Sequence, residues 1–124
     1  MLAGTALATV VVCSACTVDN SGGDSSGNGA QKLTVSASDT ACEVSADHAP
    51  AGTLTFTVKN NGSKMNEFYL LSQDGKKVVG EVEDIGPGLS RSLVVHAQAG
   101  KYVTACKPGM TGKGLRAGFT VTGS

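Results

Sequence analysis

The sequence predicts an all-β domain of the sandwich class, built from about seven strands. In several short segments apolar residues alternate with polar ones, which is typical of strands with one buried face. Turn-forming Gly, Asn, Asp and Pro separate these segments at regular spacing. Valine and threonine, which suit pleated sheets, are frequent, and the 17 glycines suit turns. A chain of 124 residues has room for one such domain.

The first strands are expected in two alternating segments and one apolar segment. Residues 33–38 alternate Leu, Val and Ala with polar side chains, and residues 53–59 alternate Leu, Phe and Val with Thr or Lys. The second segment ends at the Asn-Asn-Gly of residues 60–62, a strong turn signal. Residues 67–71 are apolar on both faces from Phe68 onward, so we expect a central strand there.

Four further strands complete the prediction. Residues 78–82 follow an Asp-Gly turn, and a Gly-Pro-Gly loop separates them from the strand expected at 89–97. A strand begins at Gly100 and ends at Cys106, and the strand at 115–122 closes the chain. Roughly ninety residues hold only a thin core, so a cross-link or a bound metal would help to stabilise it.

The N-terminal region predicts export and membrane anchoring, and we do not expect it to be part of the folded domain. Residues 2–12 form an apolar run too short to span a bilayer and of the length found in signal peptides. The small residues that follow resemble a bacterial lipobox, with residues 1–15 as signal peptide and Cys16 as the lipidated N-terminus. We expect an extracytoplasmic protein held to the cell membrane; removal by an ordinary signal peptidase is the alternative.

A polar linker joins this anchor to the folded part. Residues 16–31 consist largely of Ser, Gly, Asn and Asp, so we expect a flexible tether. About fifteen such residues have a root-mean-square reach of roughly 20 Å. The folded domain is therefore expected at residues 32–124.

Charge and residue types exclude some function classes. Lys plus Arg number 10 and Asp plus Glu number 10, so the chain has no net charge, and it has no Trp. Proteins that bind nucleic acids usually show a basic excess or stripe, so we expect no such partner. With only two histidines the chain has no arrangement typical of hydrolysis or group transfer, and we expect no enzymatic activity.

The two cysteines of the folded part, Cys42 and Cys106, carry the candidate chemistry. Export permits a disulfide between them, which would close a loop of about 64 residues. Such a bond contributes about 4 kcal/mol in the chain-entropy model. The alternative is that one or both thiolates bind a metal. The two interpretations compete, because a disulfide would consume both thiolates.

The strand that ends at Cys106 and the Pro-Gly loop after it resemble the last two strands of a cupredoxin. That family implies a Greek-key β-sandwich with a copper site at the loop. Here Asn66 stands at the upstream histidine position, Met110 at the loop histidine position and Leu115 at the axial methionine position. A blue-copper site needs two imidazoles and a thiolate, so we do not expect blue-copper electron transfer.

Longer shared segments resemble the cupredoxin-like domain of EfeO-type iron-uptake proteins. They cover residues 41–44, 50–53, 67–69, 80–83, 85–90 and 105–110. This resemblance implies a domain that binds copper or iron and assists an iron permease, with a haem peroxidase in the same system.

The candidate metal ligands are Cys42, Glu67, Cys106 and Met110. Thiolate and thioether sulfur favour Cu(I), whereas carboxylates favour harder ions such as Fe(III). Simpler roles stay open: Met110 could pack against the core, and Glu67 could be a solvated charge at a strand edge. The acidic run at residues 81–84 is expected to be a solvated face.

Two functions from different classes follow. The first is an extracytoplasmic, lipid-anchored domain that binds copper or iron for an EfeO-type iron-uptake system. The alternative is a metal-free module, locked by a disulfide, that docks on a membrane partner.

Overall fold

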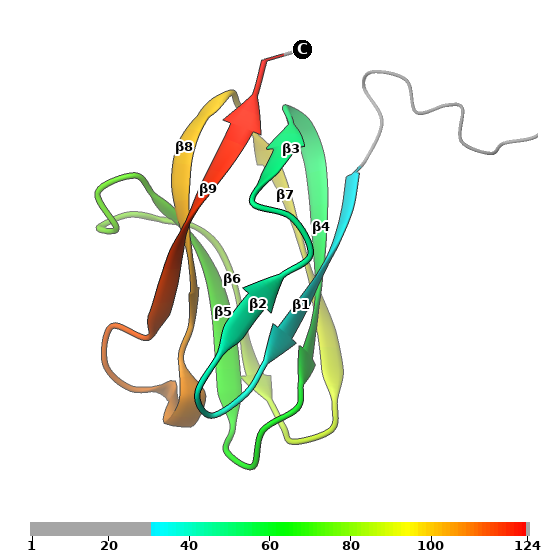
Figure 1. Cartoon of the computed structure of the whole chain (residues 1–124), viewed down its shortest axis with the longest axis vertical. Helices are drawn as coiled ribbons and strands as arrows, with labels where there is room; N and C mark the ends of the chain where they lie inside the picture. The colour runs from blue at the N-terminus through cyan, green and yellow to red at the C-terminus, as the bar shows by residue number, and fades with distance from the viewer. Residues whose placement is uncertain (1–30, 124) are drawn as a thin grey trace, which may run out of the picture.

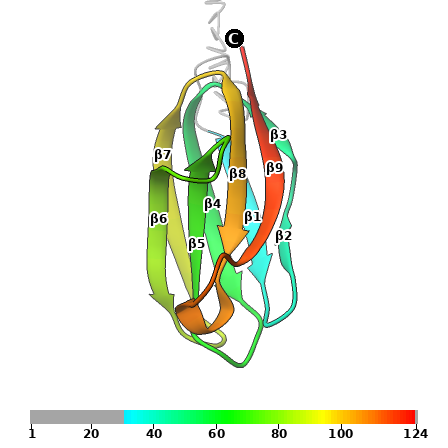
Figure 2. The same cartoon turned by 90° about the vertical axis from the view of Figure 1, so that its left-hand side faces the viewer.

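In the described part of the chain, nine strands form two sheets that pack face to face (Figures 1 and 2). The computed structural model describes residues 31–123. The predicted signal peptide, the lipidation site Cys16 and the tether up to residue 30 lie outside the described residues. Within the described part of the chain, no helix has the length and apolar character needed to cross a membrane.

The smaller sheet has four strands in the order β2-β1-β4-β7. Strands β1 and β4 run parallel, and the other two pairings are antiparallel. The strands are β1 (Gln31–Ala37), β2 (Cys42–Val44), β4 (Gly52–Asn60) and β7 (Ser90–Ala97).

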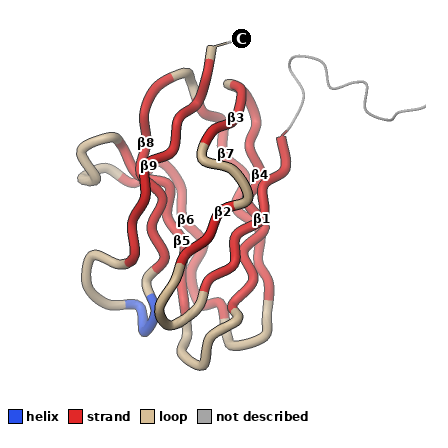
Figure 3. The backbone as a smooth tube through the Cα atoms, in the orientation of Figure 1, coloured by secondary structure: helices blue, strands red, loops and turns tan. Residues whose placement is uncertain are grey.

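The larger sheet has five strands in the order β3-β9-β8-β5-β6, and only its β3–β9 pair is parallel. A short 3-10 turn, η2 (Pro108–Met110), lies in the loop between β8 and β9 (Figure 3). The strands are β3 (His48–Pro50), β5 (Asn66–Ser72), β6 (Val78–Ile85), β8 (Gly100–Cys106) and β9 (Leu115–Thr122).

The predicted β-sandwich is confirmed, with nine strands in place of about seven. The two additional strands are β2 and β3, each of three residues. Three residues are too few to show alternation. Both strands lie at sheet edges, where each pairs with only one neighbouring strand. The seven longer strands lie where the sequence predicts them, to within a few residues at their ends.

The core consists of the inward-facing residues of both sheets. Phe56 of β4 lies at its centre, with ring centroids 5.2 Å from Phe68 of β5 and 5.6 Å from Phe119 of β9. Phe56 and Phe68 are fully buried and Phe119 is 2 % exposed. Contacts between these rings join the two sheets, and they supply most of the aromatic burial that the composition allows.

The two ends of the sandwich differ. One end, here called the disulfide pole, gathers the β1–β2 turn and the loops β4–β5, β6–β7 and β8–β9 (Figure 1). The described chain begins and ends at the opposite end, where Gln31 pairs with Leu54 and Ala51 donates a backbone hydrogen bond to Thr122 at 2.9 Å. The described chain therefore begins and ends far from the disulfide pole.

Candidate functional site

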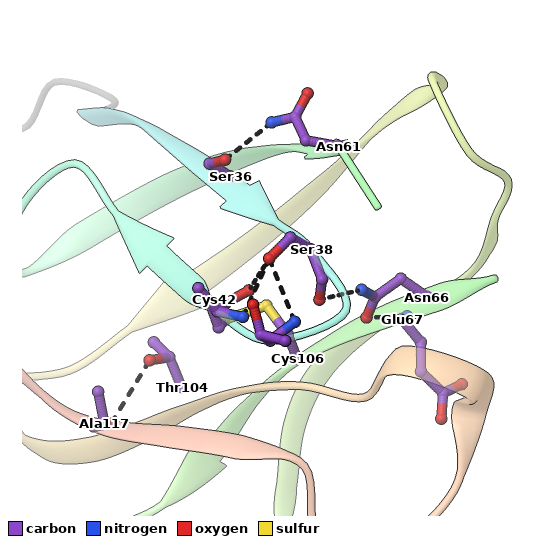
Figure 4. The surroundings of a disulfide bond; sticks show 11 residues. Ser36, Ser38, Cys42, Asn61, Asn66, Glu67, Thr104, Cys106 and Ala117 are labelled. Atoms are coloured by element: carbon purple, nitrogen blue, oxygen red, sulfur yellow. Dashed lines mark hydrogen bonds between the residues drawn. A yellow bond between two sulfur atoms is a disulfide. The ribbon is translucent and has the colours of Figure 1, made fainter. Parts of the chain in front are cut away.

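Cys42 and Cys106 form a disulfide at this pole (Figure 4). Their Cα atoms are 5.6 Å apart, and 64 positions separate them in the chain. The bond joins edge strand β2 of the smaller sheet to central strand β8 of the larger one. Cys106 is fully buried and Cys42 is half-buried. In this oxidised form neither sulfur is a free thiolate, so metal binding by the cysteines remains a prediction for the reduced protein.

Two buried asparagines hold the loops around the disulfide. Asn60 donates from Nδ2 to the carbonyls of Lys64 at 2.7 Å and Ile85 at 2.8 Å, and its Oδ1 accepts the N–H of Gly62 at 2.9 Å. Asn66 donates from Nδ2 towards the carbonyl of Ser38 at 3.4 Å (Figure 4). Buried amides need such hydrogen-bond partners, so we interpret both side chains as structural: they hold the loops in place.

The residues at the copper position of this fold do not fit a blue-copper site. The sulfur of Cys106 is bonded to that of Cys42, and the side-chain amide of Asn66 donates a hydrogen bond to the carbonyl of Ser38 in the β1–β2 turn. Both histidines lie at the other end of the sandwich. His48 pairs with the end of β9, and Nδ1 of His96 is 2.9 Å from Oγ1 of Thr53. The set of two imidazoles and a thiolate that such a site requires is therefore not assembled.

Glu67 lies on the face of the larger sheet that is turned away from the core. Side chains alternate along β5, so Phe68 contacts the core beside Cys106, whereas Glu67 and Tyr69 project outward. Glu67 is nevertheless only 6 % exposed and Tyr69 only 8 %. Figure 4 shows the Glu67 carboxylate directed away from the disulfide, towards the β8–β9 loop. The carboxylate and the cysteine sulfurs thus lie on opposite faces of one sheet.

Glu67 on β5 and Glu81 on β6 are the carboxylates nearest to Tyr69 in the sheet. Glu81 stands directly opposite Tyr69 in the ladder, and Glu83 follows on the same strand. Burial raises the pKa of the Tyr69 phenol well above its usual range, and the neighbouring carboxylates of Glu67 and Glu81 raise it further. The charge of Glu81, followed by those of Glu67 and Asp84, raises the pKa of Glu83. We call Glu67, Tyr69, Glu81 and Glu83 the acidic cluster.

The acidic cluster has no cationic partner at salt-bridge distance. Within residues 31–123, the single ion pair closer than 4.0 Å joins His48 and Asp47, remote from the cluster. Lys107 is the nearby cation, and its Nζ lies 4.3 Å from the centroid of the Tyr69 ring. The backbone N–H of Lys107 donates to the carbonyl of Glu67 at 2.9 Å. Lys107 therefore covers the ring of Tyr69 without neutralising a carboxylate.

Met110 lies at the rim of the disulfide pole and is 37 % exposed. The N–H of the preceding Gly109 donates to the carbonyl of Met65 at 2.7 Å, which ties the β8–β9 loop to the start of β5. Met65 is 39 % exposed and Leu89, on the neighbouring β6–β7 loop, is 60 % exposed. Met65, Leu89 and Met110 form an exposed group that we call the apolar rim.

The four predicted ligands therefore occupy three places. Cys42 and Cys106 are joined, Glu67 lies on the outer face, and Met110 lies on the rim. In the part of the chain that the structure describes, no three His, Cys, Asp or Glu side chains converge closely enough to hold a metal ion. Glu81, Glu83 and Tyr69 were not predicted as neighbours of Glu67. The signal available was the hairpin register between residues 67–71 and 78–82, together with the i, i+2 spacing of the two glutamates.

Comparison with known proteins identifies a domain family and curated relatives. A model of the cupredoxin-like domain family matches residues 5–121. The iron uptake system component EfeO of Yersinia pestis is 33 % identical over 76 residues, which is 61 % of this chain and 20 % of that protein. The chain thus spans about a fifth of the length of the curated relatives it matches.

Solved structures share the fold at low sequence identity. Rusticyanin from Thiobacillus ferrooxidans superposes with a TM-score of 0.61 at 17 % identity, covering 78 % of this chain and 79 % of rusticyanin. Reduced auracyanin from Roseiflexus castenholzii superposes with a TM-score of 0.55 at 15 % identity, covering 75 % and 96 % of the two chains.

Proposed function

Because the chain belongs to the cupredoxin-like domain family, we propose that it is an extracytoplasmic metal-binding domain of an EfeO-type iron-uptake system. The similarity to EfeO supports a role in iron uptake. Lipid attached to Cys16 anchors the domain outside the cell membrane in this proposal. An iron permease and a haem peroxidase of the same system are the proposed partners, and iron is the cargo.

The observation that carries the proposal is the position of Glu67, a residue only 6 % exposed, beside the glutamates of β6 with no cationic side chain of the described residues within 4.0 Å. Carboxylates that lie near one another repel, and a bound cation would offset that repulsion. Glu81 and Glu83 are exposed on β6, so their side chains are free to turn towards Glu67. A hard cation such as Fe(III) suits this set of oxygen atoms, which the phenol of Tyr69 adjoins.

Copper is the second candidate metal, and its proposed ligands are sulfur atoms. Cys42 and Cys106 can bind Cu(I) only as thiolates, so copper binding requires reduction of the disulfide. The thioether of Met110 offers a further soft ligand from the neighbouring loop. In this proposal iron binds to the outer face of the oxidised protein, and Cu(I) binds at the disulfide pole of the reduced protein.

Equilibrium dialysis of the full chain tests both metals separately. The oxidised protein is dialysed against Fe(III) and Cu(II), and the reduced protein against Cu(I). Glu67→Gln should weaken Fe(III) binding at least tenfold, whereas Glu43→Gln, at an exposed carboxylate of the smaller sheet, should not. Cys106→Ser should abolish Cu(I) binding, and Met110→Ala should weaken it. Absence of metal binding by both forms of the wild-type protein would contradict the proposal.

The disulfide favours a second function, a metal-free docking module. A covalent link between the sheets gives a rigid pole, and the apolar rim supplies an exposed surface there for a membrane partner. Titration of free thiols under native conditions separates the two functions when combined with dialysis. Absence of free thiols together with absence of metal uptake would establish the docking role over the metal-binding one.

A further inference from the structure

A second feature of the larger sheet lies beside the β5–β6 hairpin, remote from the disulfide. Gln73 of this hairpin borders two adjoining open hollows on the outer face of β8 and β9, with volumes of about 310 Å³ and 290 Å³, and Asp74 and Gly75 border the first of them. Gln73, Val103 and Gly118 line both cavities. We call this continuous hollow the hairpin groove. In Figure 1 the hairpin projects sideways from the sheet near β8 and β9.

Arg116 stands at one end of the hairpin groove in a fixed position. Its Nε donates to the carbonyl of Lys113 at 2.9 Å, and its Nη1 occupies the space that a Cβ at Gly75 would need. Gly75 has φ +74°, so glycine both permits the turn and leaves room for the guanidinium. No carboxylate of the described residues lies within 4.0 Å of Arg116. The guanidinium therefore keeps unused N–H donors beside the groove.

Lys101 stands at the other end of the groove. In the β8–β9 ladder Lys101 pairs with Thr120, Val103 with Gly118, and Ala105 with Arg116. Lys101 and Arg116 are thus two outward-facing rows apart, which corresponds to about 13 Å along the strands. The row between them, Val103 and Gly118, is uncharged. A cation at each end and an uncharged floor between them define the chemistry of the groove.

Asp74 also lines the groove, but among the described residues it forms no ion pair with Arg116 within 4.0 Å. Its carboxylate accepts hydrogen bonds from the hydroxyl of Ser72 at 2.6 Å and from the N–H of Lys76 at 2.9 Å, which hold it in the hairpin turn. Its negative charge offsets one of the two cations, so Lys101 and Arg116 leave the groove with a net positive charge. Gly118 leaves the floor open, because a Cβ built there meets no atom within 4 Å.

From this geometry we propose that the hairpin groove is a binding site for linear organic dicarboxylates. Arg116 holds one carboxylate through its planar fork of donors, and Lys101 pairs with the other. The carbon chain between them lies on Val103 and Gly118. The site uses strands β8 and β9 and no residue of the acidic cluster, so it stands independently of metal binding.

Isothermal titration calorimetry with the full oxidised chain tests this site. The probes are linear dicarboxylates from succinate to suberate, with octanoate as a single-carboxylate probe of matched length. Suberate should bind at least tenfold more tightly than octanoate, and affinity should rise with length along the dicarboxylate series, because both cations must be reached. Equal affinity for suberate and octanoate would overturn the proposal.

Variants locate the binding within the groove. Arg116→Gln and Lys101→Gln should each lower the affinity for suberate to that for octanoate, whereas Lys32→Gln, on the smaller sheet, should leave it unchanged. Gly118→Val should abolish binding by filling the floor. If Lys32→Gln weakens binding as much as Arg116→Gln does, the anion is held by general surface charge and the groove is not the site. The Arg116 and Lys101 variants alter exposed side chains, so they decide the question even if Gly118→Val fails to fold.

Discussion

The carboxylate of Asp39 accepts hydrogen bonds from both the backbone N–H and the hydroxyl of Ser63, which clamps the β1–β2 turn onto the β4–β5 loop. The N–H of Lys64 donates to the same carboxylate at 3.1 Å. The clamped turn leads directly into Cys42. A polar contact and a covalent bond therefore hold the same segment at the disulfide pole.

This clamp makes stability depend on pH. The hydroxyl of Ser63, then the N–H groups of Ser63 and Lys64, lower the pKa of Asp39 below its usual value. A lowered pKa in the folded state means that the stabilisation is complete above about pH 4 and is lost as pH falls through the folded value. Asp39→Asn should therefore lower the melting temperature at pH 7, and the difference from wild type should shrink below pH 4. A difference that is constant from pH 7 to pH 2 would contradict the assigned role.

The disulfide should supply a large part of the stability of this domain. A loop of 64 residues corresponds to about 4 kcal/mol in the chain-entropy model. The double variant Cys42→Ala, Cys106→Ala should lower the free energy of unfolding in urea by about that amount. Reductant should bring wild type close to the variant and leave the variant unchanged. A wild-type urea midpoint insensitive to reductant would show that the bond contributes little.

The acidic cluster predicts an unusual tyrosine. Burial first, and then the carboxylates of Glu67 and Glu81, raise the pKa of Tyr69. An ordinary phenol ionises near pH 10, so Tyr69 should remain protonated there in the folded protein. The raised pKa stabilises the fold below about pH 10, and this contribution is lost as pH rises further, because the unfolded state ionises first.

Absorbance at 295 nm during alkaline titration measures this effect. Comparison of wild type with Tyr69→Phe isolates the signal of Tyr69, and Glu67→Gln should shift its ionisation to lower pH. The shift should be partial, because burial is the larger cause and remains in the variant. An unchanged titration in Glu67→Gln would show that the two groups do not interact.

Phe56 should be the most sensitive aromatic position of the core. It contacts Phe68 and Phe119 and is fully buried, so Phe56→Ala leaves a cavity between the sheets. We expect a loss of about 3–5 kcal/mol in the free energy of unfolding, measured with urea. Val94→Ala, at a 59 % exposed position of β7, is the matched control and should change stability by less than about 0.5 kcal/mol.

Gly80 should resist replacement because β6 packs closely on β7. A Cβ at Gly80 would collide with Cγ1 of Val95 and would lie 3.2 Å from Cδ1 of Leu93. Gly80→Ala should therefore lower the free energy of unfolding by about 1–3 kcal/mol. Adding Val95→Ala should recover part of that loss in a double-mutant cycle, since it removes the colliding methyl group. Strictly additive effects of the two substitutions would contradict the packing explanation.

Most of the long strands were predictable because their inward residues alternate with polar ones, and β5 because it is a short apolar run. Leu54, Phe56 and Val58 show this in β4, and the same three side chains are fully buried. The short strands β2 and β3 were not predictable, because three residues carry no period and their pairing depends on neighbours distant in the chain. The seven predicted strands and the sandwich class thus followed from local pattern.

The candidate site was predictable only in part. The sequence indicates that Cys42 and Cys106 are the sole cysteines of the folded part, but only the structure brings them together. Glu67 was selected by resemblance, whereas its neighbours on β6 depend on strand register. That register shifts between Asn66 and Phe68, where Asp84 adopts φ +56°. An irregularity of this kind leaves no pattern in the sequence.

The bond between Cys42 and Cys106 also decides how the molecule responds to tension. Residues 43–105 lie inside the covalent loop, and Glu67, Glu81 and Glu83 are among them. A pull on the two chain ends can detach strands β1 and β9 from their sheets, but the disulfide between Cys42 and Cys106 then carries the force. The segment that carries the acidic cluster would feel no stretching while the bond is intact, and chemical reduction would place it under load.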